Sequence, residues 1–217
     1  MSEQLWRDVD TYFGGLLVGP DTALDAALES NAATGLPAID VSPALGKLLR
    51  LLASSIGARR ILEVGTLGGY STIWLARALP PDGRLVTCEL DPKHVAVARE
   101  NLARAGLDSI VEVVEGPAVD TLASVAGPFD LVFIDADKPS IPEYFTHALR
   151  LSHPGTMIIV DNVVRRGSVI DADSDDAAVR GTRRFAEMLA AEERVSATVI
   201  QTVGSKGHDG FALAVVR

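Results

Sequence analysis

From Arg60 onward, short apolar runs alternate with longer segments whose apolar residues recur at helical spacing. The short runs predict buried strands, and the longer segments predict amphipathic helices. Strands that alternate with helices are joined by right-handed crossovers, which produce a mostly parallel sheet with helices on both faces. The sequence therefore predicts an α/β fold.

The predicted elements follow one another without a repeat or a long linker. Helices are predicted at 5–17, 21–33 and from Ser42-Pro43 onward; the first is interrupted by Gly14-Gly15. The predicted strands are 60–64, 84–88, 110–114, 129–134 and 156–160, and the helices that follow them are 71–79, 92–105, 119–125, 141–151 and 175–191. Two β-rich runs, 195–202 and 211–216, predict a terminal antiparallel hairpin with a long tip at 205–210. We expect one domain over 1–217, which includes a helical segment at 1–57.

Charge and cysteine content narrow the class of protein. The net charge of -9 argues against a nucleic-acid partner, because phosphate binding needs clustered Lys and Arg. The single cysteine, Cys88, excludes an intrachain disulfide and lies in an apolar run, which predicts a buried thiol. Met1–Arg7 is polar and unlike a signal peptide, and no apolar run is long enough for a membrane span. We expect a cytoplasmic protein that binds no membrane.

The first predicted strand leads directly into a glycine-rich turn, Glu63–Ser71, which contains Gly65, Gly68 and Gly69. Ligands of parallel α/β sheets bind beyond the carboxyl ends of the strands, and glycine lets a ligand approach the backbone. The second strand ends in Glu89, whose carboxylate can accept hydrogen bonds from both hydroxyls of a ribose. The sequence therefore predicts a nucleoside-containing ligand at this edge of the sheet.

The glycine spacing distinguishes two such ligands. A pyrophosphate favours the pattern G-x-G-x-x-G, whose second glycine lets the phosphate touch the backbone, but Leu67 occupies that position here. S-adenosylmethionine has no phosphate, and Glu63 adds a carboxylate near the expected position of its ammonium group. We expect S-adenosylmethionine, with a nicotinamide dinucleotide or a turn without ligand as the alternatives.

Polar side chains also follow the fourth and fifth predicted strands. Asp135 comes after the fourth strand, and Asp161 and Asn162 come after the fifth. Because neighbouring strands end at the same edge, these three side chains are expected to converge. Carboxylate and amide oxygens are hard ligands that suit Mg²⁺ first, and also Mn²⁺ or Ca²⁺, with positions left for water or substrate. The alternative is that these carboxylates only cap helices.

Four motifs together are similar to those of a known enzyme family. They are Glu63–Ser71, Glu115–Ala118, Phe133–Lys138 and Asp161-Asn162. In this order and spacing they resemble the cation-dependent class I O-methyltransferases, which include caffeoyl-CoA and catechol O-methyltransferases and their bacterial relatives. The resemblance extends from about Ile39 to the C-terminus. It implies a Rossmann-like class I methyltransferase fold, with a seven-stranded, mostly parallel sheet and a C-terminal antiparallel hairpin.

The resemblance also implies roles for single residues. Asp135, Asp161 and Asn162 would hold the metal, and Lys138 matches the general base of the catechol enzymes. The alternative for Lys138 is a solvated lysine at a helix start. A homodimer is implied as well, with the N-terminal helices in or near its interface. The residues expected to contact S-adenosylmethionine are Val41, Glu63, Gly65, Thr66, Ser71, Glu89, Ala118, Asp135 and Asp137.

The implied reaction is methylation of a small phenolic or catechol-like acceptor. A divalent cation stabilises the phenolate, and a nearby positive charge lowers the pKa of a lysine that acts as base. After Asn162 the sequence departs from the plant caffeoyl-CoA pattern, because Arg165 and Arg166 replace a frequent Trp-Asn pair. The arginines can bind a carboxylate or phosphate of the acceptor, or they are solvated loop residues.

Two other functions are compatible with these motifs. Some bacterial relatives methylate a hydroxylated uridine of tRNA, and a basic stripe that joins Arg59-Arg60, Arg165-Arg166 and Arg183-Arg184 would favour that function. A scaffold domain that kept the fold without catalysis is the second alternative. The intact Asp135 and Lys138 argue against it.

Overall fold

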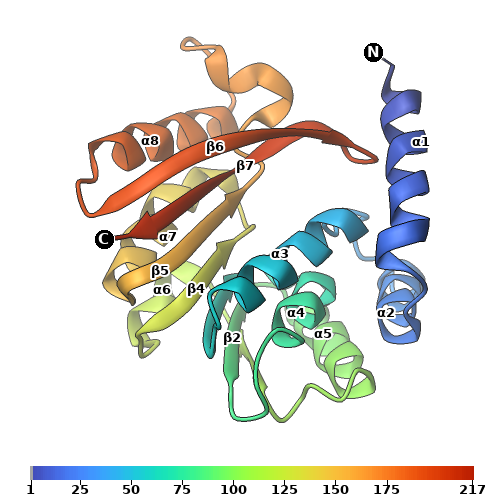
Figure 1. The fold of residues 1–217 in the computed structure, drawn as a ribbon. Helices are drawn as coiled ribbons and strands as arrows, with labels where there is room; N and C mark the ends of the chain where they lie inside the picture. Colours follow the sequence, from blue (N-terminus) through green and yellow to red (C-terminus); the bar gives the residue numbers. More distant parts are fainter. Residues whose placement is uncertain (1) are drawn as a thin grey trace.

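Figure 1 shows the fold of the chain in a computed structural model. Seven strands form one sheet, in the order β3-β2-β1-β4-β5-β7-β6. The structure describes residues 2–217, so Met1 of the polar N-terminal segment lies outside the described residues. The strands β3, β2, β1, β4 and β5 run parallel, and β7 pairs antiparallel with both β5 and β6. The predicted α/β fold with a C-terminal hairpin is confirmed. The strands are β1 (Arg60–Val64), β2 (Arg84–Glu89), β3 (Val111–Glu115), β4 (Phe129–Ile134), β5 (Ser152–Asp161), β6 (Val195–Gly204) and β7 (Gly207–Val216).

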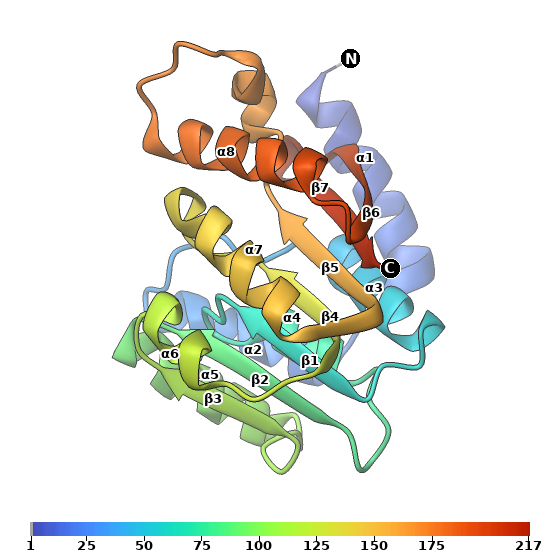
Figure 2. The same ribbon diagram turned by 90° about the vertical axis from the view of Figure 1, so that its left-hand side faces the viewer.

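Helices cover both faces of the sheet (Figure 2). One face packs against α2 (Thr22–Ala33), α3 (Pro43–Ser55), α4 (Tyr70–Ala76) and α5 (Pro92–Arg104). The other packs against α6 (Ala118–Ser124), α7 (Ile141–Arg150) and α8 (Ala177–Ala191). An apolar cluster lies on each face of the sheet, and the side chains of β4 alternate between the two clusters. Phe133 packs in the cluster under α3 and α4, whereas Val132 and Ile134 pack in the cluster under α7 and α8. Among residues 2–217, no helix has the length and apolarity needed to cross a membrane.

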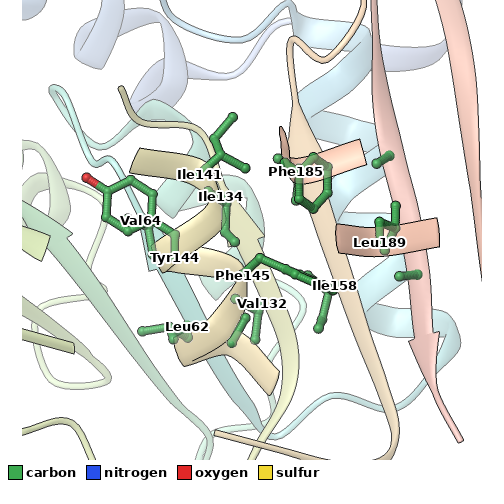
Figure 3. Close-up of a cluster of buried hydrophobic side chains, with 14 of the residues drawn as sticks. Leu62, Val64, Val132, Ile134, Ile141, Tyr144, Phe145, Ile158, Phe185 and Leu189 are labelled. Carbon is green, nitrogen blue, oxygen red and sulfur yellow. The ribbon is translucent and has the colours of Figure 1, made fainter. Parts of the chain in front are cut away.

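The cluster under α7 and α8 is drawn in Figure 3. Its aromatic centre is Phe145 of α7 and Phe185 of α8, whose rings meet edge to face at a centroid distance of 5.3 Å. Ile158 of β5 and Leu189 of α8 extend the same cluster. This packing fixes α7 over β4 and β5, and thereby fixes the chain segment that connects β4 to α7.

Helix starts follow the local sequence. Asp21 accepts hydrogen bonds from the backbone N–H groups of Ala23 and Leu24, each at 3.1 Å, and so caps α2. Ser42 caps α3 in the same way, and Pro43 occupies its first position, as predicted. The Gly14-Gly15 pair does not end the first helix. Instead α1 (Glu3–Phe13) continues into a π-helix at Gly14–Val18.

The tip of the terminal hairpin differs from the prediction of a long loop. The ladder between β6 and β7 continues to Val203↔His208 and Gly204↔Gly207, so that only Ser205 and Lys206 form the turn. Gly207 has φ 93°, a conformation that glycine adopts without strain. The tip lies beside α1 (Figure 1), where Asp10 accepts a 2.7 Å hydrogen bond from the backbone N–H of Ser205.

Candidate active site

A cavity of about 710 Å³ lies beyond the carboxyl ends of the parallel strands. Its walls come from the segments that follow β1, β2, β3, β4 and β5, and from the segment before α3. This is where parallel α/β sheets bind ligands, and the volume is that of a small-molecule site. The predicted site residues that line it are Val41, Gly65, Thr66, Ser71, Glu89, Ala118, Asp135, Asp137, Lys138, Asn162 and Arg165.

The turn after β1 brings the backbone close to the segment after β4. Gly65 has φ 95°, and a Cβ atom there would meet the carbonyl oxygen of Asp135 at 2.1 Å. Only glycine fits this position, because any side chain would push β1 and β4 apart where both enter the cavity. The close approach sets Thr66 and Asp135 on adjoining parts of the wall.

Glu63 lies behind the cavity wall, contrary to the expectation that it contacts the cofactor. It is 0% exposed and does not line the cavity. Its carboxylate accepts hydrogen bonds from the hydroxyls of Ser71 (2.7 Å), Thr72 (2.5 Å) and Thr87 (2.8 Å). Burial raises the pKa of Glu63 to about 7, although the three hydroxyl donors lower it. Glu63 therefore orients Ser71, which does line the cavity.

Glu89 fastens the end of β2 to the turn after β1. One carboxylate oxygen, Oε2, accepts hydrogen bonds from the backbone N–H groups of Thr66 (3.1 Å) and Leu67 (2.8 Å). The other, Oε1, accepts one from the N–H of Asp91 (3.0 Å) and lies 3.3 Å from Nδ1 of His94. The carboxylate lines the cavity as predicted, and it also organises the backbone around it.

Lys138 begins the 3₁₀ turn Lys138–Ser140, which connects β4 to α7, and lines the cavity. It is buried, and its ammonium donates a 2.8 Å hydrogen bond to Asp135 Oδ1. The alternative of a solvated lysine is therefore wrong. Asp137, two residues after Asp135, accepts hydrogen bonds from the hydroxyl of Tyr144 and from the backbone N–H of Ser140. The Asp137 carboxylate raises the pKa of Tyr144, as does burial, which is the larger cause.

Asp135 and Asp161 follow paired positions of adjacent strands, since Ile134 of β4 pairs with Val160 of β5. Asp161 is buried, with 5% of its surface exposed, and Asn162 lines the cavity. Burial and the neighbouring Asp135 hold the pKa of Asp161 well above its usual range. Two adjacent carboxylates, of which Asp135 opposes the ionisation of Asp161, form with the nearby amide oxygen of Asn162 a donor set that fits a hard divalent cation.

Residues 2–217 contain no cluster of three or more His, Cys, Asp or Glu side chains that could hold a metal. The predicted set differs from such a cluster, because it has two carboxylates and the amide of Asn162 as its third member. The fit of these residues to a metal rests on the adjacency and burial of Asp135 and Asp161.

Arg165 and Arg166 lie in different environments. Arg165 is half-buried and lines the cavity next to Asn162, whereas Arg166 is exposed and does not line it. Local sequence does not distinguish the two neighbouring arginines.

Family membership is decided by comparison with known proteins. A family model described as O-methyltransferase matches residues 21–215. This chain belongs to the O-methyltransferase family. The catechol O-methyltransferase of Niastella koreensis is 55% identical over 221 residues, which cover 100% of both chains. The catechol O-methyltransferase of Mycobacterium tuberculosis is 56% identical over 211 residues, which cover 97% of this chain and 96% of that protein.

Solved structures of O-methyltransferases have the same fold. One from Bacillus cereus, in complex with S-adenosylhomocysteine, has a TM-score of 0.98 at 55% identity and covers 100% of both chains. One from Streptomyces achromogenes, involved in tomaymycin synthesis and in complex with S-adenosylmethionine, has a TM-score of 0.97 at 55% identity, covering 100% of this chain and 99% of that one. The expected family, fold and enzyme class are thus confirmed, and a scaffold without catalysis is not supported.

Several residues of the O-methyltransferase cavity are absent from the sequence-based prediction. They are Ile39, Asp40, Val64, Leu67, Tyr70, Leu90, His94, Pro117, Val119, Ala136, Ser140 and Tyr144; Cys88, predicted only as a buried thiol, also lines it. The sequence contains a signal for His94, because Asp91-Pro92 predicts a helix start directly after Glu89, and His94 in the first turn of that helix then lies near the end of β2. The sequence contains no such signal for Tyr144, because its hydroxyl reaches Asp137 only through the packing of α7.

Proposed function

We propose that this O-methyltransferase transfers the methyl group of S-adenosylmethionine to one hydroxyl of a small catechol, with a divalent cation held by Asp135, Asp161 and Asn162. The observation that supports the proposal is that Asp135 and Asp161 follow paired positions of β4 and β5, while Asp135, Lys138 and Asn162 line the cavity and Asp161 is buried behind it. The catechol O-methyltransferases of similar sequence and the related structures that contain S-adenosylmethionine or its product support it.

The strand order suggests where each ligand part binds. Glu89 ends β2 and Ala118 follows β3, so the nucleoside would lie at this end of the cavity. Gly65 and Ser71 follow β1, in the middle, where the methionine part would lie. Asp135 and Asn162 follow β4 and β5, which leaves the other end for the acceptor.

The chemistry at the acceptor end is a direct methyl transfer. A divalent cation would supply positive charge that favours the phenolate over the phenol. In its neutral amine form, Lys138 would accept the phenolic proton on Nζ, and Asp135, whose Oδ1 lies 2.8 Å from that nitrogen, would keep the side chain in position. The phenolate oxygen then forms a bond to the methyl carbon, while the carbon–sulfur bond breaks and its electron pair returns to sulfur. The products are the methyl ether and S-adenosylhomocysteine.

The tRNA alternative loses its expected basic stripe. Arg60 begins β1, so Arg59 and Arg60 lie at the amino edge of the sheet, where Arg59 pairs with Asp82. Arg165 follows β5 at the carboxyl edge. The two arginine pairs therefore lie at opposite edges of the sheet and form no common surface for a phosphate backbone.

The test is a methyl-transfer assay with purified protein, S-adenosylmethionine and 3,4-dihydroxybenzoate or its methyl ester. We expect S-adenosylhomocysteine and a monomethyl ether with Mg²⁺, and loss of turnover in EDTA that added Mg²⁺ or Mn²⁺ reverses. Full turnover in EDTA would exclude the metal, and methylation of tRNA that carries a hydroxylated uridine in place of the catechols would exclude the acceptor class.

A further inference from the structure

The guanidinium of Arg165 is a cation of the cavity without a protein partner. Within residues 2–217 it forms no ion pair or side-chain hydrogen bond, and its Nε is buried without an acceptor. The other lining side chains that can carry a positive charge each have a carboxylate partner: Lys138 pairs with Asp135, and His94 Nδ1 lies 3.3 Å from Glu89 Oε1. A buried donor without an acceptor is costly, which indicates a missing partner.

The acidic residues of the lining are already engaged. Asp40 accepts a 2.9 Å hydrogen bond from Asn31, and Glu89 accepts hydrogen bonds from backbone N–H groups. Asp135 is bonded to Lys138, and Asp137 to Tyr144. Each carboxylate of the lining therefore has a hydrogen-bond partner, and none of these partners is Arg165.

The backbone holds Arg165 in a strained conformation. Arg165 and Arg166 both have φ 55°, a left-handed conformation that costs a residue other than glycine about 1–2 kcal/mol. Asp209 of β7 maintains it, because its Oδ1 accepts hydrogen bonds from the backbone N–H groups of Val164 (3.1 Å) and Arg165 (3.0 Å). Strain that is maintained by a dedicated contact beside a ligand cavity points to a functional side chain.

The position of Arg165 separates it from the expected cofactor. It follows β5, which lies two strands from β1 and three from β2. Neighbouring strands are about 4.8 Å apart, so the end of β5 is about 10 Å from the glycine turn and about 14 Å from Glu89. Arg165 adjoins Asn162, at the acceptor end of the cavity.

We propose that Arg165 binds an anionic substituent of the acceptor, so that the preferred substrates are catechols whose ring carries a carboxylate. This inference rests on the proposed function and names the substrate class of the same site. A guanidinium presents its N–H groups in a planar fork that matches the two oxygens of a carboxylate. With both hydroxyls directed to Lys138 and Asn162, the carboxylate would extend toward Arg165.

The experiment compares 3,4-dihydroxybenzoate with its methyl ester, which has the same ring and hydroxyls but no negative charge. We expect the wild type to prefer the acid in kcat/KM. Arg165→Gln should lower kcat/KM for the acid about 10- to 100-fold more than for the ester, mainly through KM, as expected for a hydrogen bond to a charged group. Arg165→Lys keeps the charge without the fork and should restore part of the preference.

Arg166→Gln is the matched control, because it removes the same charge at the same φ from the neighbouring, exposed position. Arg166→Gln should leave the ratio of kcat/KM for the acid to kcat/KM for the ester within about threefold of the wild-type ratio. The inference would be overturned if Arg165→Gln lowered kcat/KM equally for the acid and the ester, or if the wild type did not prefer the acid. A weaker affinity of Arg165→Gln for S-adenosylmethionine would assign the guanidinium to the cofactor carboxylate and overturn it as well.

A binding measurement separates this inference from the proposed function. Calorimetry with S-adenosylhomocysteine present and no turnover should give tighter binding of the acid than of the ester to the wild type, and no such difference in Arg165→Gln. If the wild type binds the acid more tightly but methylates neither compound, the proposed function fails and the inference stands. If the protein methylates both equally well and binds them equally, the inference alone fails.

Discussion

The ammonium nitrogen of Lys138 lies 2.8 Å from Oδ1 of Asp135, and both residues line the cavity where the chain leaves β4. The lysine is buried, although it begins a short 3₁₀ turn, a position at which most lysines are solvated. Its place follows from the turn after β4, which brings residues three apart in sequence onto the same side. The base proposed for the reaction is thus held by a residue proposed to bind the metal.

Lys138→Met should lower kcat about 10²- to 10⁴-fold, the usual contribution of a general base, and leave the affinity for S-adenosylmethionine nearly unchanged. Methionine keeps the length and apolar stem of the side chain and removes the amine. Steady-state kinetics with an ordinary catechol and with nitrocatechol, which ionises more readily, provide the measurement. The defect should be smaller with nitrocatechol. Wild-type turnover of the ordinary catechol by the variant would show that another group takes the proton.

Asp161→Asn should stabilise the protein without metal and abolish its response to metal. The pKa of Asp161 is raised to about 7 by burial and by Asp135, while its unfolded value is near 4. Because the folded state binds the Asp161 proton more tightly than the unfolded state, the free energy of unfolding falls as pH rises from about 4 through 7, and the full loss is present above 7. Asparagine has no proton to lose, so it avoids this loss of stability, and it still accepts the hydrogen bond from the backbone N–H of Asn162.

Urea denaturation in EDTA at pH 8 should show Asp161→Asn more stable than wild type by about 1–3 kcal/mol, with no difference near pH 4. Mg²⁺ should raise the Tm of wild type and not that of the variant. A variant that is less stable at pH 8, or that still responds to Mg²⁺, would contradict the proposed role of Asp161.

Glu89→Ala should raise the Kd for S-adenosylmethionine about 10- to 150-fold, because it removes a charged acceptor and frees the backbone N–H groups of Thr66 and Leu67. Calorimetry measures this effect. Glu115→Ala is the control: Glu115 pairs with Glu89 in the sheet register but is exposed and does not line the cavity. Unchanged affinity in Glu89→Ala, or equal loss in both variants, would remove Glu89 from the cofactor site.

A homodimer is expected to form through the N-terminal helical segment. Tyr12, Phe13, Leu16 and Leu17 are each more than half exposed and lie together at the end of α1 and in the π-helix that follows. Such an apolar patch marks an interaction surface. Light scattering at micromolar concentration should give twice the 22.9 kDa of one chain, and Leu16→Glu should give the monomer mass. A wild-type mass of 22.9 kDa would contradict the dimer.

The elements whose formation depends mainly on residues close in sequence were predicted accurately. Strand β1 has its predicted bounds, and α3 begins at Pro43 after its serine cap, because periodicity and capping are properties of short segments. The cavity could be located for the same reason, since Glu89, Asp135 and Asn162 lie at the carboxyl ends of strands that the sequence predicted to be parallel. The hairpin tip was predicted less well, because pairing with a neighbouring strand outweighed its glycine content.

Only the tertiary structure decided which predicted site residues reach the cavity. Glu63 and Ser71 belong to one motif, yet Glu63 is buried behind Ser71 through hydrogen bonds that include Thr87 of β2. Arg165 and Arg166 are identical in type and have the same φ, yet only Arg165 lines the cavity, where Asp209 from the last strand accepts a hydrogen bond from its backbone N–H. The sequence by itself determined the strands, the turns and the chemistry at their ends. The direction of each side chain depends on contacts between residues far apart in the chain, which form only when the sheet and its helices have packed together.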